Sequence, residues 1–422
     1  MTDLLLKNVR VSRDDAVDVL VRAGRIVRIG PGVDAAAAGA AAADAAAADA
    51  AAAGAAAAGA AAADTLVEDG GGALLLPGLI EGHTHLDKTN WESPWYVNEV
   101  GSALTDRIDN ERAWRASTGH DAGSHARALA LAFLREGTTR IRSHVDVDTD
   151  AGLRHLDGVH AIREELAGRV DIQTVAFPQS GLLIRPGTAE LLDQALAQGA
   201  DVLGGLDPSA IDRDPAKSLD VLFGLADKHG KPVDIHLHEP GELGAFTLDL
   251  ILDRVAALGM QGKVVISHAF CLGGIDAKRL DGLLRRLAAL DAAVLTTAPP
   301  SRPVPAVRAC REAGVTIFGG NDGIRDTWTP YGSPDMLARA MMIGLRNDLR
   351  RDDEVEWAFD CVSGAAARAC GFADYGLTPG ARADLVLVDA SCVAEAVVTR
   401  KPRRLVVAGG AIVARNGLDA IA

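Results

Sequence analysis

The sequence is poor in cysteine and in long apolar runs. It has five cysteines, at positions 271, 310, 361, 370 and 392, and no two of them form a CxxC pair. An odd number of widely spaced cysteines argues against a disulfide framework and indicates a reducing compartment. No run reaches the ~18 apolar residues of a membrane-spanning helix, and the first residues lack a basic stretch followed by an apolar core. We therefore expect a cytoplasmic protein with no membrane partner.

Positive charge and aromatic residues are also scarce. Lys and Arg total 43 against 57 Asp and Glu, which gives a formal net charge of −14, and aromatic residues make up 4% of the chain. Such a charge balance argues against binding to nucleic acid or to an anionic membrane surface. The length of 422 residues fits one barrel of ~250 residues with an accessory domain better than several small domains.

Eight apolar runs alternate with stretches typical of helices. The runs cover residues 73–86, 138–146, 170–179, 200–208, 232–239, 263–268, 292–299 and 315–322, and the helical stretches include 125–136, 187–197, 218–228, 248–258 and 277–290. This alternation predicts an α/β fold, a (β/α)8 TIM-type barrel. We expect the barrel to occupy residues 73–375.

Both ends of the chain carry short apolar runs separated by turn residues, at 4–11, 17–30, 377–389 and 404–413. They predict a small β-sandwich domain built from residues 1–72 and 376–422. Residues 34–64 are almost entirely alanine, with Asp or Gly at every fifth position. That period matches neither a helix nor a strand, so this low-complexity segment is interpreted as a tolerated surface insertion rather than a spacer or partner-binding helix.

Two histidines one residue apart, His83 and His85, end the first apolar run. Residues i and i+2 of a strand point to the same side, so both imidazoles aim at one point. Neutral imidazole is a good ligand for Zn, Fe or Ni, and three or four such groups hold a catalytic metal with one position open for water. The pair therefore indicates a metal site if other parts of the chain supply the remaining ligands.

Histidines and acids also end the fifth, sixth and eighth runs, namely His236, His238 and Glu239, then His268, then Asp322. The carboxyl ends of barrel strands share one face, and active sites of this fold form there. We therefore expect these side chains to share a site.

Six motifs in order carry a family resemblance. They are Pro-Gly-Leu-Ile-Glu-Gly-His-Thr-His-Leu-Asp-Lys, Ser-His-Val-Asp-Val, Ala-Phe-Pro-Gln-Ser-Gly, Asp-Ile-His-Leu-His-Glu, Ile-Ser-His-Ala-Phe and Asn-Asp-Gly-Ile-Arg-Asp-Thr-Trp. With them the chain resembles the amidohydrolase superfamily and, within it, the cytosine deaminase-like branch. The resemblance covers essentially the whole chain apart from the alanine-rich segment.

The resemblance implies one divalent metal ion, Zn2+ or Fe2+, with Mn2+ also open, and a bound water whose pKa falls toward ~7. Its implied ligands are His83, His85, His236 and Asp322. Glu239 would take a proton from that water and deliver it to the ring nitrogen of the substrate. His268 would orient the water and stabilise the developing oxyanion or leaving group, and Asp322 would also accept the proton passed to departing ammonia. The fourth run ends without a lysine that could bridge two metals, so we expect a mononuclear site.

Three further residues are candidate substrate contacts. His238 forms a second HxH with His236 and could compete for the metal, but the spacing to Glu239 favours His236, and His238 is then a contact of the substrate or of a ligand. Gln179 matches a glutamine that binds the amide edge of a pyrimidine, with a surface position as the alternative. Trp328 would cover the ring or simply pack.

Cytosine deaminases of this type carry an acid directly after the metal aspartate, where this chain has Gly323. The missing side chain leaves room and removes a hydrogen-bond acceptor, which favours a substituted ring such as 5-methylcytosine or an N-alkylamino-triazine. Asp326 and Arg325 are expected to supply replacement polar contacts. We expect His144 and Asp146 to support the ligands, and the remaining histidines to be solvated, at positions 120, 125, 155, 160 and 229.

The main hypothesis is a metal-dependent hydrolase that deaminates an amino-substituted N-heterocycle, cytosine or a substituted cytosine, and releases ammonia. The alternative is an amidohydrolase that removes an alkylamine from an s-triazine, as N-isopropylammelide hydrolases do. A remote alternative is a non-catalytic barrel that binds a partner. The expected partner is a small heterocyclic substrate, and a homo-oligomer is expected only because relatives commonly form one.

Overall fold

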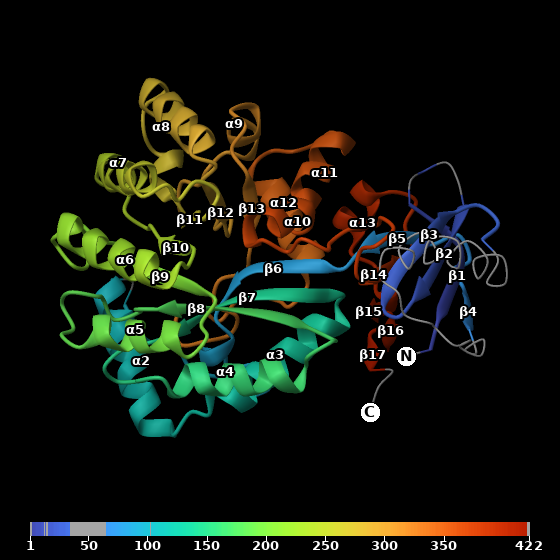
Figure 1. The fold of residues 1–422 in the computed structure, drawn as a ribbon, viewed down its shortest axis with the longest axis horizontal. Coiled ribbons are helices and arrows are strands. Elements are labelled where there is room, and N and C mark those ends of the chain that lie inside the picture. Colours follow the sequence, from blue (N-terminus) through green and yellow to red (C-terminus); the bar gives the residue numbers. More distant parts are fainter. Residues whose placement is uncertain (1, 12, 14–15, 34–64, 102, 420–422) are drawn as a thin grey trace, which may run out of the picture. The chain divides into compact units, whose positions relative to one another are not determined.

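The computed structural model describes residues 2–11, 13, 16–33, 65–101 and 103–419 (Figure 1). The chain divides into two compact units, of which the smaller comprises Met1–Gly78, Arg135–Gly137 and Ala373–Ala422 and the larger Leu79–Leu134 and Thr138–Phe372. The boundaries expected from the sequence, 72/73 and 375/376, fall close to these divisions. The alanine-rich segment 34–64, with both of its interpretations, lies outside the described residues.

The larger unit is a parallel barrel with helices between its strands. Its sheet runs in the order β13-β12-β11-β10-β9-β8-β7-β6, and an isolated parallel bridge from Thr84 to Asp322 joins its two ends. The strands are β6 (Leu79–Thr84), β7 (Thr138–Asp146), β8 (Asp171–Phe177), β9 (Val202–Leu206), β10 (Val233–His236), β11 (Val264–Ser267), β12 (Ala293–Thr296) and β13 (Ile317–Gly319). The predicted (β/α)8 fold is confirmed.

Helices α2 to α9 lie between successive strands of this unit, and α10 to α12 follow its last strand. They are α2 (Leu104–Thr118), α3 (Ala122–Arg135), α4 (Arg154–Glu165), α5 (Thr188–Ala197), α6 (Pro215–His229), α7 (Gly241–Ala257), α8 (Ala277–Ala289), α9 (Val307–Glu312), α10 (Met336–Arg346), α11 (Asp352–Asp360) and α12 (Gly364–Cys370), with short 3-10 turns η1 (Leu86–Lys88) and η2 (Phe270–Gly273). Local signals set some bounds. For α6, the Asp214 side chain accepts the N–H of Lys217, Pro215 begins the helix, and Gly230 ends it in the left-handed conformation.

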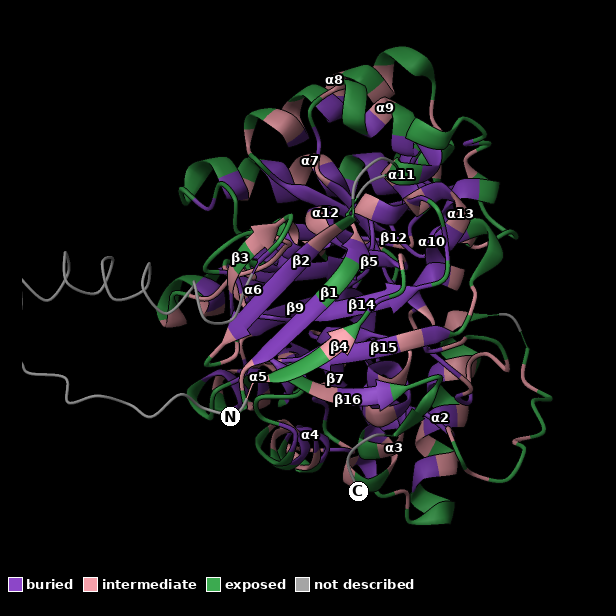
Figure 2. Ribbon diagram, turned by 90° about the vertical axis from the view of Figure 1, so that its right-hand side faces the viewer, coloured by how far each residue is buried: buried purple, intermediate pink, exposed green. Residues whose placement is uncertain are grey.

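The smaller unit contains a nine-stranded sheet from both chain ends, in the order β17-β16-β15-β14-β5-β1-β2-β3, with β4 paired to β1. The elements are β1 (Leu4–Arg10), β2 (Ala16–Arg22), β3 (Arg25–Gly30), β4 (Leu66–Asp69), β5 (Leu74–Pro77), β14 (Leu385–Val388), α13 (Val393–Thr399), β15 (Arg403–Ala408), β16 (Ala411–Arg415) and β17 (Leu418–Asp419). Side chains from both halves share one core, among them Leu6, Val19, Leu385 and Leu405. Figure 2 shows β4 largely exposed, whereas β14 is buried.

The expectation of one continuous first strand over residues 73–86 is wrong. Leu74–Pro77 pairs with β14 as strand β5 of the smaller unit, whereas Leu79–Thr84 is the first barrel strand. Pro77 has no backbone N–H to donate, and proline is accordingly confined to strand ends and edges. The apolar run is therefore divided between two sheets.

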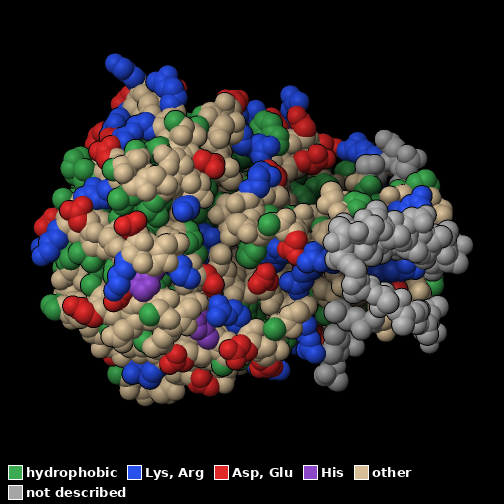
Figure 3. Space-filling view, in the orientation of Figure 1, with side chains coloured by type: hydrophobic (Ala, Val, Ile, Leu, Met, Phe, Trp, Pro, Cys, Tyr) green, Lys and Arg blue, Asp and Glu red, His purple; other side chains and the backbone are tan. Residues whose placement is uncertain are grey.

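The surface of the barrel unit carries charges of both signs. On the face of the barrel unit seen in Figure 3, Lys and Arg side chains are interspersed with Asp and Glu. No helix within the described ranges is long and apolar enough to cross a membrane. The five cysteines are free and buried.

Two glycines allow the ends of β6 and β13 to approach each other. A Cβ on Gly82 would lie 2.7 Å from both the Gly319 carbonyl oxygen and the Phe318 ring. A Cβ on Gly320 would lie 2.6 Å from the Cβ of His83. Both positions thus require glycine for close packing rather than for an unusual φ.

We predict that Gly82→Ala lowers the free energy of unfolding by about 2 kcal/mol, because the added methyl overpacks the barrel core. The control is Gly224→Ala in α6, where a Cβ meets no atom within 4 Å, and there we expect a gain of about 0.5–1 kcal/mol. Urea denaturation of both variants provides the measurement. Equal stability of the two variants would contradict the packing argument.

Candidate metal centre and active site

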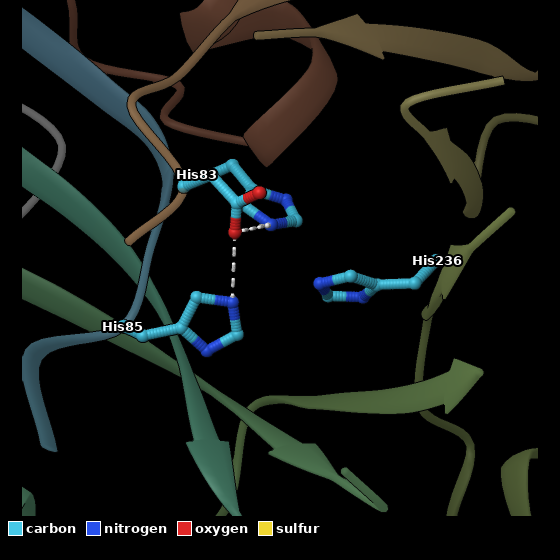
Figure 4. A group of neighbouring side chains, drawn as sticks. His83, His85 and His236 are labelled. Carbon is cyan, nitrogen blue, oxygen red and sulfur yellow. Dashed lines mark ion pairs between the residues drawn. The ribbon is translucent and has the colours of Figure 1, made fainter. Parts of the chain in front are cut away.

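Four side chains from three barrel strands gather at one point. His83 follows Gly82 in β6, His85 follows that strand, His236 ends β10 and Asp322 follows β13. One potential ligand atom from each lies within 4.8 Å of the others. In Figure 4 the three imidazoles point toward one another, and dashed lines mark the approach of His83 Nε2 and His85 Nε2 to Asp322 Oδ1, at 3.7 and 3.2 Å. The structure thus brings together the ligand set that the resemblance implied.

The donor atoms of this group fit a divalent metal. Within the described part of the chain, the buried Nε2 of His83 and both ring nitrogens of His236 have no hydrogen-bond partner. Buried polar atoms normally find partners, so this cluster of unpaired nitrogens around a carboxylate is unusual. Burial and the surrounding imidazoles hold the pKa of His236 well below its ordinary value, which keeps the ring neutral. Neutral imidazoles and one carboxylate are a donor set for Zn, Fe or Mn.

A buried carboxylate joins two of the three strands that carry these ligands. Glu81 Oε1 accepts the N–H groups of His83 and Asn321, and Glu81 Oε2 accepts Asn321 Nδ2. The side-chain oxygen of Asn321, Oδ1, in turn accepts two N–H groups of Arg339. Burial raises the pKa of Glu81 to about 7, against the lowering effect of these hydrogen bonds. This network was not predicted from the sequence, although Glu81 lies two residues before the predicted ligand His83 and Asn321 directly precedes the predicted ligand Asp322.

Backbone conformation also places two site residues. Asp322 and His268 have φ values of 67° and 69°, in a region that non-glycine residues rarely occupy. Such outliers concentrate at functional sites, where the surrounding structure maintains them. The Thr84 hydroxyl donates to the Asp322 carbonyl, and the Asp322 N–H donates to the His83 carbonyl, which holds Asp322 in this conformation.

The ring of His83 is oriented by a hydrogen bond of its Nδ1, the nitrogen other than the Nε2 that approaches Asp322. Its Nδ1 lies 3.0 Å from the Ser267 hydroxyl, which donates to Asp234. Asp234 also accepts Arg142 Nη1 at 2.9 Å. His83, His144 and Asp234 form a second group with metal-ligand geometry, but the Arg142 cation already neutralises Asp234 and disfavours a second metal there. His144 is buried with its ring 4.0 Å from that of His83, which agrees with the expected supporting position.

Glu239 lies three residues beyond His236 with its carboxylate firmly held. Oε1 accepts the backbone N–H groups of Ser209 and Ala210 at 2.8 and 2.9 Å, and Oε2 accepts the Thr247 hydroxyl. Burial raises the pKa of Glu239, against the lowering effect of the Thr247 hydrogen bond. A raised pKa suits a group that must both take and give a proton near neutral pH.

His238 and His268 stack beside the metal group, with ring centroids 4.4 Å apart. His238 Nδ1 lies 2.7 Å from Asp207 Oδ2; burial lowers the pKa of His238, but Asp207 raises it above its ordinary value. His268 Nε2 lies 4.0 Å from Asp322 Oδ2. His238 is absent from both groups with metal-ligand geometry, so His236 is the better candidate ligand of the two.

A buried lysine that the sequence analysis left without a role lies beside this group. Lys88 Nζ donates to Gln179 Oε1 at 2.5 Å and to Asp146 Oδ1 at 3.3 Å. It lies 5.9 Å from the centre of the Phe177 ring, which stacks on His236 at 4.1 Å. Burial lowers the pKa of Lys88, but Asp146 and other acids raise it well above the ordinary value, so the ammonium is charged. Its spacing of three residues after His85 is the only signal of this position in the sequence.

The expectation that Gly323 leaves room for a ring substituent is wrong, because the space beside it is occupied. A Cβ there would lie 1.9 Å from Asp326 Oδ2, so the Asp326 carboxyl fills the room that was assigned to a ring substituent. Asp326 Oδ1 accepts the N–H groups of Trp328 and Thr329. Burial raises the pKa of Asp326 to about 6, against the lowering effect of Lys88. Arg325 instead lies over the rings of two tryptophans, at positions 91 and 95.

The expectation that all peripheral histidines are solvated is wrong for His155. It is 6% exposed, and its Nδ1 lies 2.8 Å from Asp87 Oδ2, which also accepts the N–H of Asp146. Burial lowers the pKa of His155, but Asp87 raises it above its ordinary value. The pair thus supports the chain between His85 and Lys88.

Comparisons with known proteins show the family of this chain. A profile of the amidohydrolase family matches residues 66–414. The chain belongs to the amidohydrolase family. Members are generally dependent on a divalent metal, in keeping with the His/Asp group described above.

Two kinds of relative resemble this amidohydrolase. The crystal structure of N-isopropylammelide isopropylaminohydrolase from Burkholderia multivorans is 60% identical, covers 100% of both chains and has a TM-score of 0.91. N-isopropylammelide isopropyl amidohydrolase of Pseudomonas sp. (strain ADP) is 28% identical over 82% of this chain and 88% of its own length. A 5-methylcytosine deaminase from Klebsiella pneumoniae, liganded with 5-fluorocytosine, is 27% identical over 99% of both chains with a TM-score of 0.80. These likenesses support the triazine alternative of the sequence analysis better than its main hypothesis, cytosine deamination.

We predict that the cost of His155→Asn to stability depends on pH. Because the folded-state pKa of His155 is raised, its ion pair with Asp87 stabilises fully below the unfolded-state pKa of ~6.5, and the contribution declines as pH rises through the folded-state value. Breaking a buried pair costs about 3 kcal/mol, so urea denaturation at pH 5.5 should show this loss, with a clearly smaller loss at pH 8.5.

The control for this prediction is His229→Asn, at a partly exposed pair with Asp193, which should change stability by less than ~1 kcal/mol. A loss for His155→Asn that is larger at pH 8.5 than at pH 5.5 would contradict the sign of the effect.

Proposed function

We propose that this protein hydrolyses the exocyclic carbon–nitrogen bond of an alkylamino-substituted, hydroxylated s-triazine of the N-isopropylammelide type and releases an alkylamine. The proposal is supported by the 60% identity to an N-isopropylammelide isopropylaminohydrolase over the whole chain. One structural observation carries it further, namely the hydrogen bond from Lys88 to Gln179.

That hydrogen bond sets the chemical character of the ring-binding edge. Because Lys88 donates to Gln179 Oε1, the amide is fixed with its oxygen toward the lysine, and its NH2 group is the part that remains for a substrate. The edge therefore offers hydrogen-bond donors. N-isopropylammelide carries two ring oxygens, both acceptors, and complements such an edge.

Cytosine deamination, the second candidate, fits this edge less well. A glutamine that reads the amide edge of a pyrimidine uses its carbonyl to accept a ring N–H and its NH2 to donate to the ring oxygen. Here the carbonyl of Gln179 is already bound to Lys88. Cytosine deamination is retained as the second candidate because the chain is 27% identical to a 5-methylcytosine deaminase.

The proposed metal ligands are His83, His85, His236 and Asp322. A divalent metal bound there would supply a Lewis acid and lower the pKa of water at its open position toward ~7. The Asp322 side chain is 40% exposed, so a small molecule can reach this group.

The protein's own groups would then manage protons and orientation. Glu239, fixed by two backbone N–H groups and Thr247, takes a proton from the attacking water and returns it to the substrate. Burial, with a further contribution from His238, keeps the pKa of His268 low, so this neutral ring can donate one hydrogen bond to charge that develops on the substrate. Overall, the water oxygen replaces the amine on the ring carbon, the C–N bond breaks, and the water proton leaves with the amine.

The metal-replete protein is expected to release isopropylamine from N-isopropylammelide, measured by chromatography beside an ammonia assay on cytosine and 5-methylcytosine. Glu239→Gln should lower kcat by roughly 10²-fold or more because the proton carrier is lost, with metal content unchanged. Glu242→Gln, on a carboxylate that is 70% exposed, is the matched control and should keep full activity. Ammonia from cytosine without any alkylamine from the triazine would overturn the assignment.

Gln179→Glu tests the donor edge directly. Glutamate has nearly the same shape and still accepts from Lys88, but it replaces the NH2 donor with a second acceptor. We expect kcat/KM for N-isopropylammelide to fall roughly 10- to 100-fold, and the exposed substitution Gln194→Glu to have no effect. An unchanged kcat/KM for Gln179→Glu would show that this edge does not bind the ring.

A further inference from the structure

Helix α2 turns charged side chains toward the barrel. Its buried residues are Ile108, Glu111 and Arg115, three to four positions apart and hence on one face. Arg115 donates to Asp146, the last residue of β7, at 2.8 Å and to Asp148, two residues beyond it, at 3.3 Å. The helix is therefore attached to the active-site face of the barrel by ion pairs that do not involve Glu111.

Glu111 links two loops that come from opposite ends of the barrel sequence. Its Oε2 accepts the indole N–H of Trp328 at 2.5 Å and lies 3.7 Å from Lys88 Nζ. The residue is 1% exposed, and its Oε1 has no hydrogen-bond partner within the described ranges. Burial of a carboxylate away from water costs free energy unless other interactions compensate for the lost hydration.

The two groups that Glu111 contacts also lie near each other and near the metal group. Lys88 Nζ is 5.3 Å from the centre of the Trp328 ring and 5.9 Å from that of Phe177. Phe177 stacks on the candidate ligand His236. Glu111 therefore contacts groups that are connected to the metal group through Phe177.

We propose that Glu111 is a positioning residue, which holds the indole of Trp328 in one orientation so that Trp328 and Lys88 together receive the heterocyclic substrate. The hydrogen bond to the indole N–H fixes rotation of the ring about its side-chain bonds, and the nearby ammonium offsets the carboxylate charge. Glu111 itself does not touch the reacting atoms. This inference rests on the proposed function only in that it takes a flat heterocycle as the substrate.

The test compares Glu111→Leu with Glu111→Gln, each alone and combined with Trp328→Phe. Gln keeps an oxygen that accepts from the indole, whereas Leu fills the space without one. Asp109→Asn on the same helix, where the carboxylate is 74% exposed, is the matched control. Retained metal content and a cooperative unfolding transition establish that each variant is folded. We expect folding to be retained, because the ion pairs of Arg115 hold helix α2 on the barrel without Glu111.

We expect Glu111→Leu to raise KM for N-isopropylammelide roughly tenfold with a change in kcat below threefold, and Glu111→Gln to restore most of the affinity. In the Trp328→Phe background, the effect of Glu111→Leu should shrink to about threefold or less, because the group it positions is gone. An unchanged KM in Glu111→Leu, or an undiminished effect in the Trp328→Phe background, would overturn the inference.

A fluorescence measurement separates failure of this inference from failure of the proposed function. The emission of Trp328, obtained by subtracting the spectrum of Trp328→Phe from that of the parent, should shift in Glu111→Leu and not in Glu111→Gln or Asp109→Asn. If the wild-type protein releases no amine or ammonia, the proposed function fails, and quenching of this emission by N-isopropylammelide or cytosine then supplies a Kd in place of KM. Identical Trp328 emission in Glu111→Leu and the parent would contradict the role of Glu111.

Discussion

The site depends on the contact that Glu81 makes between the first and last barrel strands. One oxygen of the Glu81 carboxylate accepts the backbone N–H groups of both His83 and Asn321. The hydrogen bonds therefore fix the backbone of His83 relative to that of Asn321. The bridge from Thr84 to Asp322 then closes the barrel at the same level. Because Gly82 and Gly320 carry no Cβ, the strand ends can approach closely enough for the contact to form. Two of the three ligand-bearing strands are thereby placed independently of any metal.

Two electrostatic environments meet at this end of the barrel. Burial and repulsion from neighbouring imidazoles keep the pKa of the His236 and His268 rings low, so these two rings are neutral. On the other side, Lys88 stays charged among Asp146, Glu111 and Asp326. Burial raises the pKa of Glu111 to about 7 and that of Asp326 to about 6, so these acids are near their titration points at neutral pH. Neutral imidazoles and a fixed cation are thus present at the same end of the barrel.

Local patterns predicted the parts of the molecule that depend on local sequence. The alternation of apolar runs with helical stretches is sufficient to predict the barrel fold. The convergence of His83 and His85 could be predicted from the two-residue period of a strand. The division of residues 73–86 into β5 and β6 was missed, because hydrophobicity does not reveal which sheet a strand joins. Lys88, Glu111 and His155 were missed for another reason: each is a charged or titratable residue buried by partners that lie far away in the sequence, such as Asp146, Trp328 and Asp87.

Two short segments directly follow candidate metal ligands and carry polar side chains toward each other's neighbourhood. The 3-10 turn Leu86–Lys88 directly follows His85, and Lys88 donates to Gln179, two residues beyond the end of β8. After Asp322, the Asp326 carboxyl fills the space beside Gly323. A glycine after the metal aspartate therefore does not enlarge the site here. It allows an acid from three residues further along the chain to lie where a directly adjacent acid would otherwise project. We therefore expect these two short segments to influence which substrate the protein accepts, since they can differ without disturbing the strands that carry the metal group.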